Sequence, residues 1–325
     1  MNSKPFRTVL KPVYLDSIDH SKKTMMMGSC FSEHIGEKMS DRKFKINLNP
    51  FGILYHPLAI SAAIDRMLEN KPFCSEDLRF ENDRYVSFFH HGKFNHTDQQ
   101  IMLKNINNAF ETGREQLLVA DYLFITWGTA FGYSLKEAVN NVVANCHKIP
   151  GNQFEKQLTD TSKIIQEYQQ LFNRLIDINP NIKIIITVSP VKHLKDGLID
   201  NNISKSVLLL AAHHLKTQIE STSYFPAFEL IHDDLRDYRF YAKDMAHPSE
   251  EAIEYVWNFF KKSYWDDTTV ELNKKIEDVL NAVKHRPLHP ENKAHQVFIE
   301  SIKNKVEDLE NDYPFLDFGK EKESL

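Results

Sequence analysis

The stretch TMMMGSCFSE, residues 24–33, determines how the first part of the chain folds. An apolar run leads into Gly28, and residues with helical spacing follow over Phe31–Met39. A continuous apolar run bounded by a glycine is typical of a buried parallel strand. We therefore expect a strand over Thr24–Gly28, a sharp turn at Cys30, and a helix directly after the turn.

The same alternation continues along the chain. Further apolar runs predict buried strands at Phe44–Leu48, Tyr122–Thr126, Ile182–Val188 and, more weakly, Tyr224–Phe225. Segments with helical spacing lie between them, at Leu58–Met67, Lys163–Ile176 and Lys205–Ile219. Since parallel strands need helical crossovers, this order predicts a doubly wound α/β fold, α/β/α in its layers, with a mainly parallel five-stranded sheet.

Two segments fall outside this pattern. The interval from about 72 to 119 is longer than an ordinary crossover and carries FFHHGKFNH, so we expect an insertion over the strand ends. After Tyr264 the sequence is charged and has helical spacing. We therefore predict one main domain over residues 1–264 and a C-terminal helical appendage over residues 265–325, with a frayed tail after Phe318.

The overall composition narrows the functional classes. Of the 325 residues, 42% are hydrophobic, which is enough for a large core. A formal net charge of -5 gives no basic excess that would attract nucleic acid or anionic lipid. The N-terminal stretch lacks a signal-peptide core, and no segment reaches the ~20 apolar residues of a membrane span. The sequence thus predicts a soluble cytoplasmic protein without a nucleic-acid partner.

Cysteines and histidines do not follow the pattern of a disulfide framework or a zinc site. The three cysteines are widely spaced and form no CxxC pair: Cys30, Cys74 and Cys146. We interpret Cys74 and Cys146 as buried, inert thiols. Adjacent histidines such as His90 and His91 would point to opposite faces of a strand, and no cysteine or paired carboxylate accompanies them at zinc-site spacing. We expect no metal and no cofactor, and one of these histidines could line a pocket.

A candidate nucleophile lies at the turn after the first predicted strand. In open α/β sheets, functional groups collect beyond the carboxyl ends of the strands, and Ser29 or Cys30 would be presented there at a helix N-terminus. Near the end of the main domain, Asp244 lies three residues before His247, so a carboxylate could orient an imidazole base. The combination predicts a nucleophile–His–Asp site. The alternative is structural, with Asp244 as a helix cap and His247 as a hydrogen-bonded histidine.

Several longer strings resemble one known family. They are GSCF (28–31), NPFGILYHP (49–57), VVANCHKIP (142–150), VSPVKHLKDG (188–197) and YFPAFELIHDDLRDYRFYAKDMAHPS (224–249). Together they resemble the GSCFA family, which is placed among the SGNH, or GDSL-like, hydrolases. The resemblance covers roughly Met26 to Tyr264. The family's eponymous motif would end in alanine where this chain has Ser32.

The resemblance implies roles for individual positions. SGNH enzymes have a Gly-Asp-Ser turn, a glycine after the second strand, Gly-x-Asn after the third and Asp-x-x-His near the end. Asp244 and His247 match the last block, and Gly52 matches the second, where its N–H would serve an oxyanion. Arg236 and Arg239 are candidates for orienting the Asp244–His247 segment.

The third block departs from the family pattern. Gly128, Thr129 and Ala130 stand where Gly-x-Asn is expected, so the side-chain oxyanion donor is absent. The side chains that could replace it, or line the substrate site, are those of Asn49, Asn145, His90 and His91.

The first block leaves a choice of nucleophile. If Gly28 aligns without a gap on the first residue of Gly-Asp-Ser, Ser29 falls on the aspartate and Cys30 on the nucleophile. This alignment favours Cys30, and the other register favours Ser29. A helix N-terminus and a nearby imidazolium are expected to lower the pKa of the Cys30 thiol.

Acyl-group chemistry is the leading hypothesis. Cys30 or Ser29 would attack an ester, thioester or other acyl donor, His247 would take the proton, and Asp244 would hold His247. This describes an esterase, thioesterase or acyltransferase acting on small molecules or, by the resemblance, on acyl groups of glycans or lipids. The second hypothesis is a non-catalytic ligand-binding module on an SGNH framework, motivated by Ala130 and by the missing Asp-Ser pair.

Overall fold

A five-stranded sheet forms the centre of the computed structural model, which describes residues 8–12, 17–138, 141–284 and 292–323. Its strands are, in order, β2 (Lys45–Leu48), β1 (Lys23–Gly28), β5 (Tyr122–Trp127), β8 (Lys183–Val188) and β9 (Thr222–Phe225). The pairs β1–β5, β5–β8 and β8–β9 are parallel, and Gly28 lies opposite Thr126. The predicted strands and the mainly parallel sheet are confirmed.

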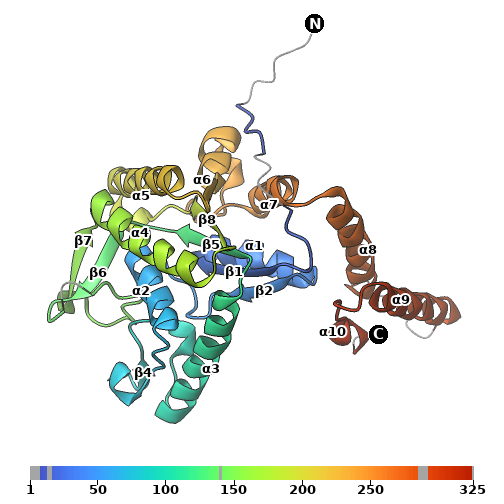
Figure 1. Ribbon diagram of the computed structural model, residues 1–325, viewed down its shortest axis with the longest axis horizontal. Helices are drawn as coiled ribbons and strands as arrows, with labels where there is room; N and C mark the ends of the chain where they lie inside the picture. Colours follow the sequence, from blue (N-terminus) through green and yellow to red (C-terminus); the bar gives the residue numbers. More distant parts are fainter. Residues whose placement is uncertain (1–7, 13–16, 139–140, 285–291, 324–325) are drawn as a thin grey trace, which may run out of the picture. The chain divides into compact units, whose positions relative to one another are not determined.

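Helices cover both faces of this sheet, as predicted (Figure 1). One face packs against α2 (Pro57–Leu68), α3 (Gln99–Leu118), α4 (Thr161–Ile178) and α5 (Leu198–Gln218). The remaining helices around the sheet are α1 (Cys30–Asp41), α6 (Ala227–Glu229) and α7 (Glu250–Tyr264), and a π-helical turn, η5 (Leu230–Leu235), follows α6. On β1, Met25 and Met27 join the core of the first face, and Met26 between them is buried as well. Burial of successive residues explains why the strands are continuous apolar runs.

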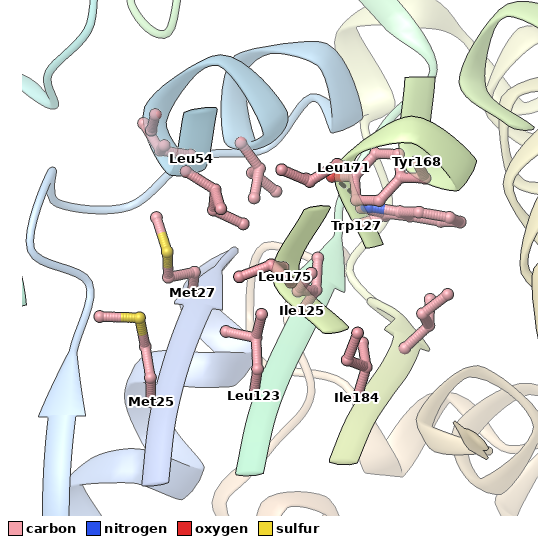
Figure 2. Close-up of a cluster of buried hydrophobic side chains, with 14 of the residues drawn as sticks. Met25, Met27, Leu54, Leu123, Ile125, Trp127, Tyr168, Leu171, Leu175 and Ile184 are labelled. Atoms are coloured by element: carbon pink, nitrogen blue, oxygen red, sulfur yellow. Dashed lines mark hydrogen bonds between the residues drawn. The ribbon is translucent and has the colours of Figure 1, made fainter. Parts of the chain in front are cut away.

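A buried polar chain ties the end of β5 to two helices. The Trp127 indole N–H donates to the Tyr168 hydroxyl at 2.9 Å, and this hydroxyl donates to the Pro57 carbonyl at 2.9 Å. Figure 2 shows Trp127 and Tyr168 beside the apolar side chains of Leu171 and Ile125. The contacts fix the start of α2 and one turn of α4 at the carboxyl end of the sheet.

Two antiparallel strand pairs were not predicted. They are β3 (Arg79–Glu81) with β4 (Arg84–Val86), and β6 (Phe131–Leu135) with β7 (Phe154–Leu158). The β3–β4 pair lies in the predicted insertion, residues 72–119, and so does α3. Because α3 places Met102, Ile106 and Phe110 in the main core, this helix is part of the sheet's packing. The predicted domain boundary at residue 264 stays a prediction.

The chain forms two compact units. The first contains Lys23–Glu37 and Ile46–Asn258, and with them most of the sheet. The second contains Lys38–Lys45 and the chain from Phe259 onward, where α8 (Asp267–Lys284) and α9 (Lys293–Asp312) share an apolar cluster. No helix in the described part of the chain combines the length and the apolar composition needed to cross a membrane.

The end of the second unit is ordered by ion pairs. After the buried Phe318, α10 (Gly319–Lys322) forms a short helix. Lys322 pairs with Glu310 of α9, and Lys43 pairs with Glu321 at 2.7 Å. The prediction of a frayed tail after Phe318 is therefore wrong for this helix.

Candidate active site

The backbone after β1 is fixed by the neighbouring strand. Gly28 has a φ of +134°, and a Cβ atom there would lie 2.2 Å from the Thr126 carbonyl oxygen. The Ser29 N–H donates to the same carbonyl at 3.2 Å. Glycine has no Cβ, so it accepts both this torsion and this close approach. The start of α1 is therefore held against the end of β5.

Ser29 faces the interior of the protein. Only 1% of its surface is exposed, and its carbonyl accepts a hydrogen bond from the Ser32 N–H at 2.9 Å. Its Oγ accepts from the Phe31 N–H at 3.4 Å. These are the contacts of a helix cap, so the geometry gives Ser29 a role at the start of α1.

Cys30 is the first residue of α1 and is partly exposed. Burial raises the pKa of its thiol, although the Cys30 backbone N–H and the Lys205 ammonium favour the thiolate. The expected lowering of this pKa is wrong, because desolvation outweighs the effect of the helix terminus. The thiolate is the reactive form, so a proton acceptor is needed before Cys30 can act as a nucleophile.

Asn49 connects the end of β2 to the same turn. Its Oδ1 accepts the Gly28 N–H at 2.9 Å, and its φ of +45° is a torsion that asparagine tolerates well. The Nδ2 atom is buried and has no hydrogen-bond partner among the described residues. A buried amide without an acceptor is costly, so a ligand oxygen at this position would satisfy it. Asn49 is one of the predicted replacements for the missing oxyanion donor.

Gly52 allows His91 to approach the loop after β2. Its φ is +78°, and a Cβ atom there would lie 2.4 Å from the His91 Cβ. The Gly52 N–H donates to the Asn49 carbonyl at 2.7 Å, so the geometry does not support its predicted use as a free oxyanion donor. The His91 ring is part-buried, and its Nδ1 accepts the Lys93 N–H at 3.3 Å.

Gly128 and Thr129 brace the loop that precedes α2. Their backbone N–H groups donate to the Tyr55 carbonyl at 2.7 and 3.1 Å. The Ala130 N–H donates to the Ser204 hydroxyl at 2.7 Å, and the Thr129 hydroxyl lies 3.1 Å from the same oxygen. All three N–H groups have acceptors within the protein, so this segment offers an oxyanion no free backbone donor in this conformation.

Lys205 is a functional candidate that the sequence analysis missed. Its Nζ donates to the Gly128 carbonyl at 2.5 Å and to the Ser189 carbonyl at 2.8 Å, and 1% of the residue is exposed. Burial lowers the pKa of Lys205 to about 7, and the charge of Cys30 opposes this shift. Lys205 and Leu208 both lie on the buried face of α5. A lysine within an otherwise apolar helix face is the sequence signal that could have revealed Lys205.

His193 is a second residue without a predicted role, although it lies in one of the family strings. Its ring contacts Tyr55 edge to face, with 5.9 Å between the centroids. Burial, and to a smaller extent the Lys205 ammonium, lower the pKa of His193 to about 4. The imidazole is therefore neutral at neutral pH.

Asp244 and His247 form a hydrogen-bonded pair on a loop before α7. His247 Nδ1 lies 2.6 Å from Asp244 Oδ2, while Asp244 Oδ1 accepts the N–H groups of Ala246 and His247 at 2.9 and 3.0 Å. These backbone bonds, with the His247 ring, lower the pKa of Asp244 to about 2. The Ser249 hydroxyl accepts from the Ala252 N–H in the first turn of α7, so the interpretation of Asp244 as the cap of that helix is wrong.

The predicted base and nucleophile belong to one electrostatic neighbourhood. Cys30 interacts with Lys205, and the charges of Lys205 and His247 both disfavour protonation of His193. Half of the His247 side chain is exposed, at 51%. Within the described residues, no hydrogen bond joins its ring to Ser29 or Cys30.

His90 and Asn145 are used locally. The His90 ring is buried and stacks on Phe51 with 4.9 Å between centroids, and its Nδ1 lies 2.9 Å from the Ser87 hydroxyl. Burial lowers the pKa of His90 to about 3, so it is a neutral core residue. Asn145 Oδ1 accepts the His147 N–H at 2.7 Å and shapes a turn.

The two arginines of the long family string lie on the surface. Arg236 pairs with Asp233 at 3.5 Å, and Arg239 lies 4.0 Å from Asp237. These side chains are exposed, so the pairs contribute little, and no ion pair with Asp244 is found among the described residues. Their predicted orienting role has no support in these contacts.

The other two cysteines have different environments. Cys74 is exposed, so its expected burial is wrong, and Cys146 is partly exposed. Side-chain hydrogen bonding with Glu76 raises the pKa of Cys74, and burial raises that of Cys146. In the part of the chain that the structure describes, no group of three or more His, Cys, Asp or Glu side chains could hold a metal ion.

The fold and these groups define an α/β protein with a parallel sheet and a cluster of ionisable side chains beyond the carboxyl ends of β1, β5 and β8. The chain belongs to the GSCFA family, whose model matches residues 23–260. Residues 276–325 match the GSCFA domain protein, C-terminal domain. The predicted family is thus confirmed.

One solved structure is distantly similar to this chain. A crystal structure of a carbohydrate esterase family 3 from Talaromyces cellulolyticus is similar over 79% of this chain and 99% of that chain, with a TM-score of 0.34 and 10% sequence identity. No curated protein has a matching sequence.

Proposed function

We propose that this protein is an SGNH-type hydrolase or acyltransferase that acts on an ester, thioester or other acyl group through Cys30, His247 and Asp244. The observation that carries the proposal is the contrast between two neighbours. Ser29 is buried and caps α1, whereas Cys30 is partly exposed at the same turn. A nucleophile must reach its substrate, so the contrast favours Cys30.

The chemistry follows from the neighbouring groups. Cys30 Sγ attacks the carbonyl carbon, the leaving group departs with a proton, and water or an acceptor alcohol then cleaves the thioester. His247 is the general base of this scheme, because Asp244 holds Nδ1 and Nε2 has no hydrogen-bond partner among the described residues. Contacts between base and nucleophile often form only when substrate binds.

Asn49 is the oxyanion donor that we favour. Its Nδ2 is buried without a partner, and the same amide holds Gly28 directly before the nucleophile turn. By contrast, the N–H groups of Gly52, Gly128 and Thr129 already have protein acceptors. A fixed amide donor that meets the developing charge is the kind of group that lowers the barrier to acyl transfer.

The substrate class follows from the family resemblance. Acyl groups carried by glycans, lipids or small molecules are the substrates that an SGNH enzyme would imply. The scheme requires no metal and no organic cofactor, because the nucleophile, base and oxyanion donor are all side chains of the chain itself.

Hydrolysis of p-nitrophenyl acetate and of short acyl-thioesters tests the proposal. We expect Cys30→Ala to abolish turnover, and Ser29→Ala to keep it with some loss of stability from the missing cap. A covalent acyl adduct on Cys30 should be detectable by mass spectrometry. Full activity in Cys30→Ala, or an adduct on Ser29, would rule out this nucleophile.

A second candidate function is a ligand-binding module without chemistry. The observations that favour it are the raised pKa of Cys30 and the occupied N–H groups around the turn. This candidate predicts no turnover on any acyl donor, together with saturable binding of an acylated ligand that survives in Cys30→Ala.

A further inference from the structure

A cavity of about 400 Å³ lies between α2, α4 and the loop after β6. The two helices pack side by side in this part of the molecule (Figure 1). Ligand pockets in proteins usually measure roughly 300–1,000 Å³, so the cavity has room for a small molecule. Cys30, Asn49, Asp244 and His247, which carry the proposed acyl chemistry, do not line it.

The wall formed by residues 142–144 is fixed by two hydrogen bonds. The Val143 N–H donates to the Tyr133 carbonyl of β6 at 2.7 Å, and the Ala144 N–H donates to the Phe88 carbonyl at 2.7 Å. Residues 142–150 form one of the family strings, and Phe88 begins the FFHHGKFNH segment of the insertion. Two segments for which the proposed acyl chemistry has no use therefore meet at a pre-formed cavity.

The walls of the cavity favour an apolar occupant. Several apolar side chains that line it are only partly buried, among them Leu58, Ala62, Phe88, Phe89, Val142 and Val143. Removal of apolar surface from water is favourable in proportion to its area. A hydrocarbon chain in the cavity would therefore be stabilised by the side chains that α2, the insertion and the loop present to it.

The α4 side of the cavity carries a positive charge. Lys163 lines the cavity, is exposed, and makes no ion pair within the described part of the chain. Glu167 lies one turn further along the same face, and its carboxylate accepts the Ser61 hydroxyl at 3.1 Å. The first turn of α4 contains no acidic residue, and the Asp160 side chain makes no cap hydrogen bond, so the helix N-terminus adds to the positive potential. An anionic head group is therefore favoured beside Lys163.

We propose that this cavity binds an amphipathic carboxylate, with its hydrocarbon chain against Leu58, Phe88 and Val142 and its carboxylate beside Lys163. Medium-chain fatty acids are the simplest members of this class. The inference does not rest on the proposed role of Cys30 as the nucleophile.

Isothermal titration calorimetry with octanoate and octanol tests both parts of the site. We expect saturable binding of both ligands and none of acetate, which lacks the chain. Lys163→Gln should weaken octanoate binding by roughly three- to fivefold, as for an exposed ion pair, and leave octanol binding unchanged. Lys104→Gln, at an exposed position of α3, is the matched control and should bind octanoate like the wild-type chain.

Ala62→Phe tests the place of the chain. Its ring would occupy the cavity, so both ligands should bind at least about tenfold more weakly. Ala109→Phe is the control, because Ala109 is a half-buried helical alanine that does not line the cavity. Three results would overturn the proposal: no saturable binding of octanoate, equal effects of Lys163→Gln on the two ligands, or unchanged binding in a folded Ala62→Phe protein.

Methyl NMR of the wild-type chain decides the case in which Ala62→Phe does not fold. Octanoate should shift the methyl signals of Leu58, Val142 and Val143, and shifts confined to other methyl groups would refute the site. Cys30→Ala should bind octanoate as tightly as the wild-type chain, and a loss of binding there would place the ligand at the nucleophile turn instead. Normal octanoate binding without acyl turnover would refute the proposed function and leave this site standing.

Discussion

The imidazole of His247 and the carboxylate of Asp244 are joined by a 2.6 Å contact between Nδ1 and Oδ2. Asp244→Asn keeps an oxygen for the two backbone N–H groups of its turn but presents an N–H to Nδ1, which moves the ring proton to Nε2. We expect acyl turnover to fall by about 10²- to 10⁴-fold with little change in melting temperature. Steady-state kinetics measure this, with Asp237→Asn on a neighbouring turn as the control. Unchanged turnover would mean that the pair only shapes its loop.

Asn49 provides a sharp test of the oxyanion site. Asn49→Asp keeps the Oδ1 acceptor for Gly28 and tolerates the positive φ, but it replaces the unpartnered Nδ2 donor by an oxygen. We expect turnover on p-nitrophenyl acetate to fall by about 10²-fold or more. Asn145→Asp, which keeps its acceptor for His147, is the matched variant. If turnover falls in Asn145→Asp and not in Asn49→Asp, the oxyanion donor is Asn145 and not Asn49.

Gly28→Ala tests the backbone geometry of the turn. The added Cβ would lie 2.2 Å from the Thr126 oxygen at a φ of +134°. We expect the free energy of unfolding to fall by roughly 3 kcal/mol, measured by urea denaturation. Gly151→Ala is the control, because a Cβ atom at that position would meet nothing within 4 Å and its effect should stay within about 0.5 kcal/mol. Equal effects of the two changes would contradict the strained contact.

His90 should make the protein sensitive to acid. Burial lowers the pKa of His90 to about 3, against about 6.5 in an unfolded chain. Between these values the unfolded chain binds a proton that the folded protein excludes, so the free energy of unfolding falls as the pH drops.

The contribution of His90 is about 1.4 kcal/mol per pH unit within that window. We expect His90→Phe, which retains an aromatic ring beside Phe51, to flatten this loss between about pH 6 and pH 4 in urea titrations. His34→Phe, at an exposed position, controls for the added apolar surface. Parallel pH curves for wild type and His90→Phe would show that His90 is protonated equally in both states.

The main sheet could be predicted because burial on both faces forces continuous apolar runs such as that of β1. The β6–β7 pair could not, because its strands carry mixed polar and apolar residues and one face is largely exposed. In the site, the pairing of Asp244 with His247 could be predicted from their three-residue spacing together with the nucleophile turn far upstream. The two residues are three positions apart, so their contact forms within one turn and does not depend on a distant part of the chain.

Other parts of the site depend on distant contacts. The Gly128 and Thr129 N–H groups are occupied by the carbonyl of Tyr55, which lies far away in the sequence. The pKa of Cys30 depends on how deeply the fold buries its sulfur, so the helix terminus and the expected imidazolium predicted the wrong direction. Lys205 remained hidden because a lysine in a helix is ordinarily a surface residue.

The turn that carries Cys30 is held through its neighbours. Gly28 is fixed by Thr126 and by the Asn49 amide, and Ser29 supplies the cap of α1. The sulfur of Cys30 takes no part in these contacts. Exchange of thiol for hydroxyl at position 30 would therefore change reactivity while the backbone stays where it is. On the proposed role of Cys30, a single substitution would exchange cysteine chemistry for serine chemistry without rebuilding the scaffold around it.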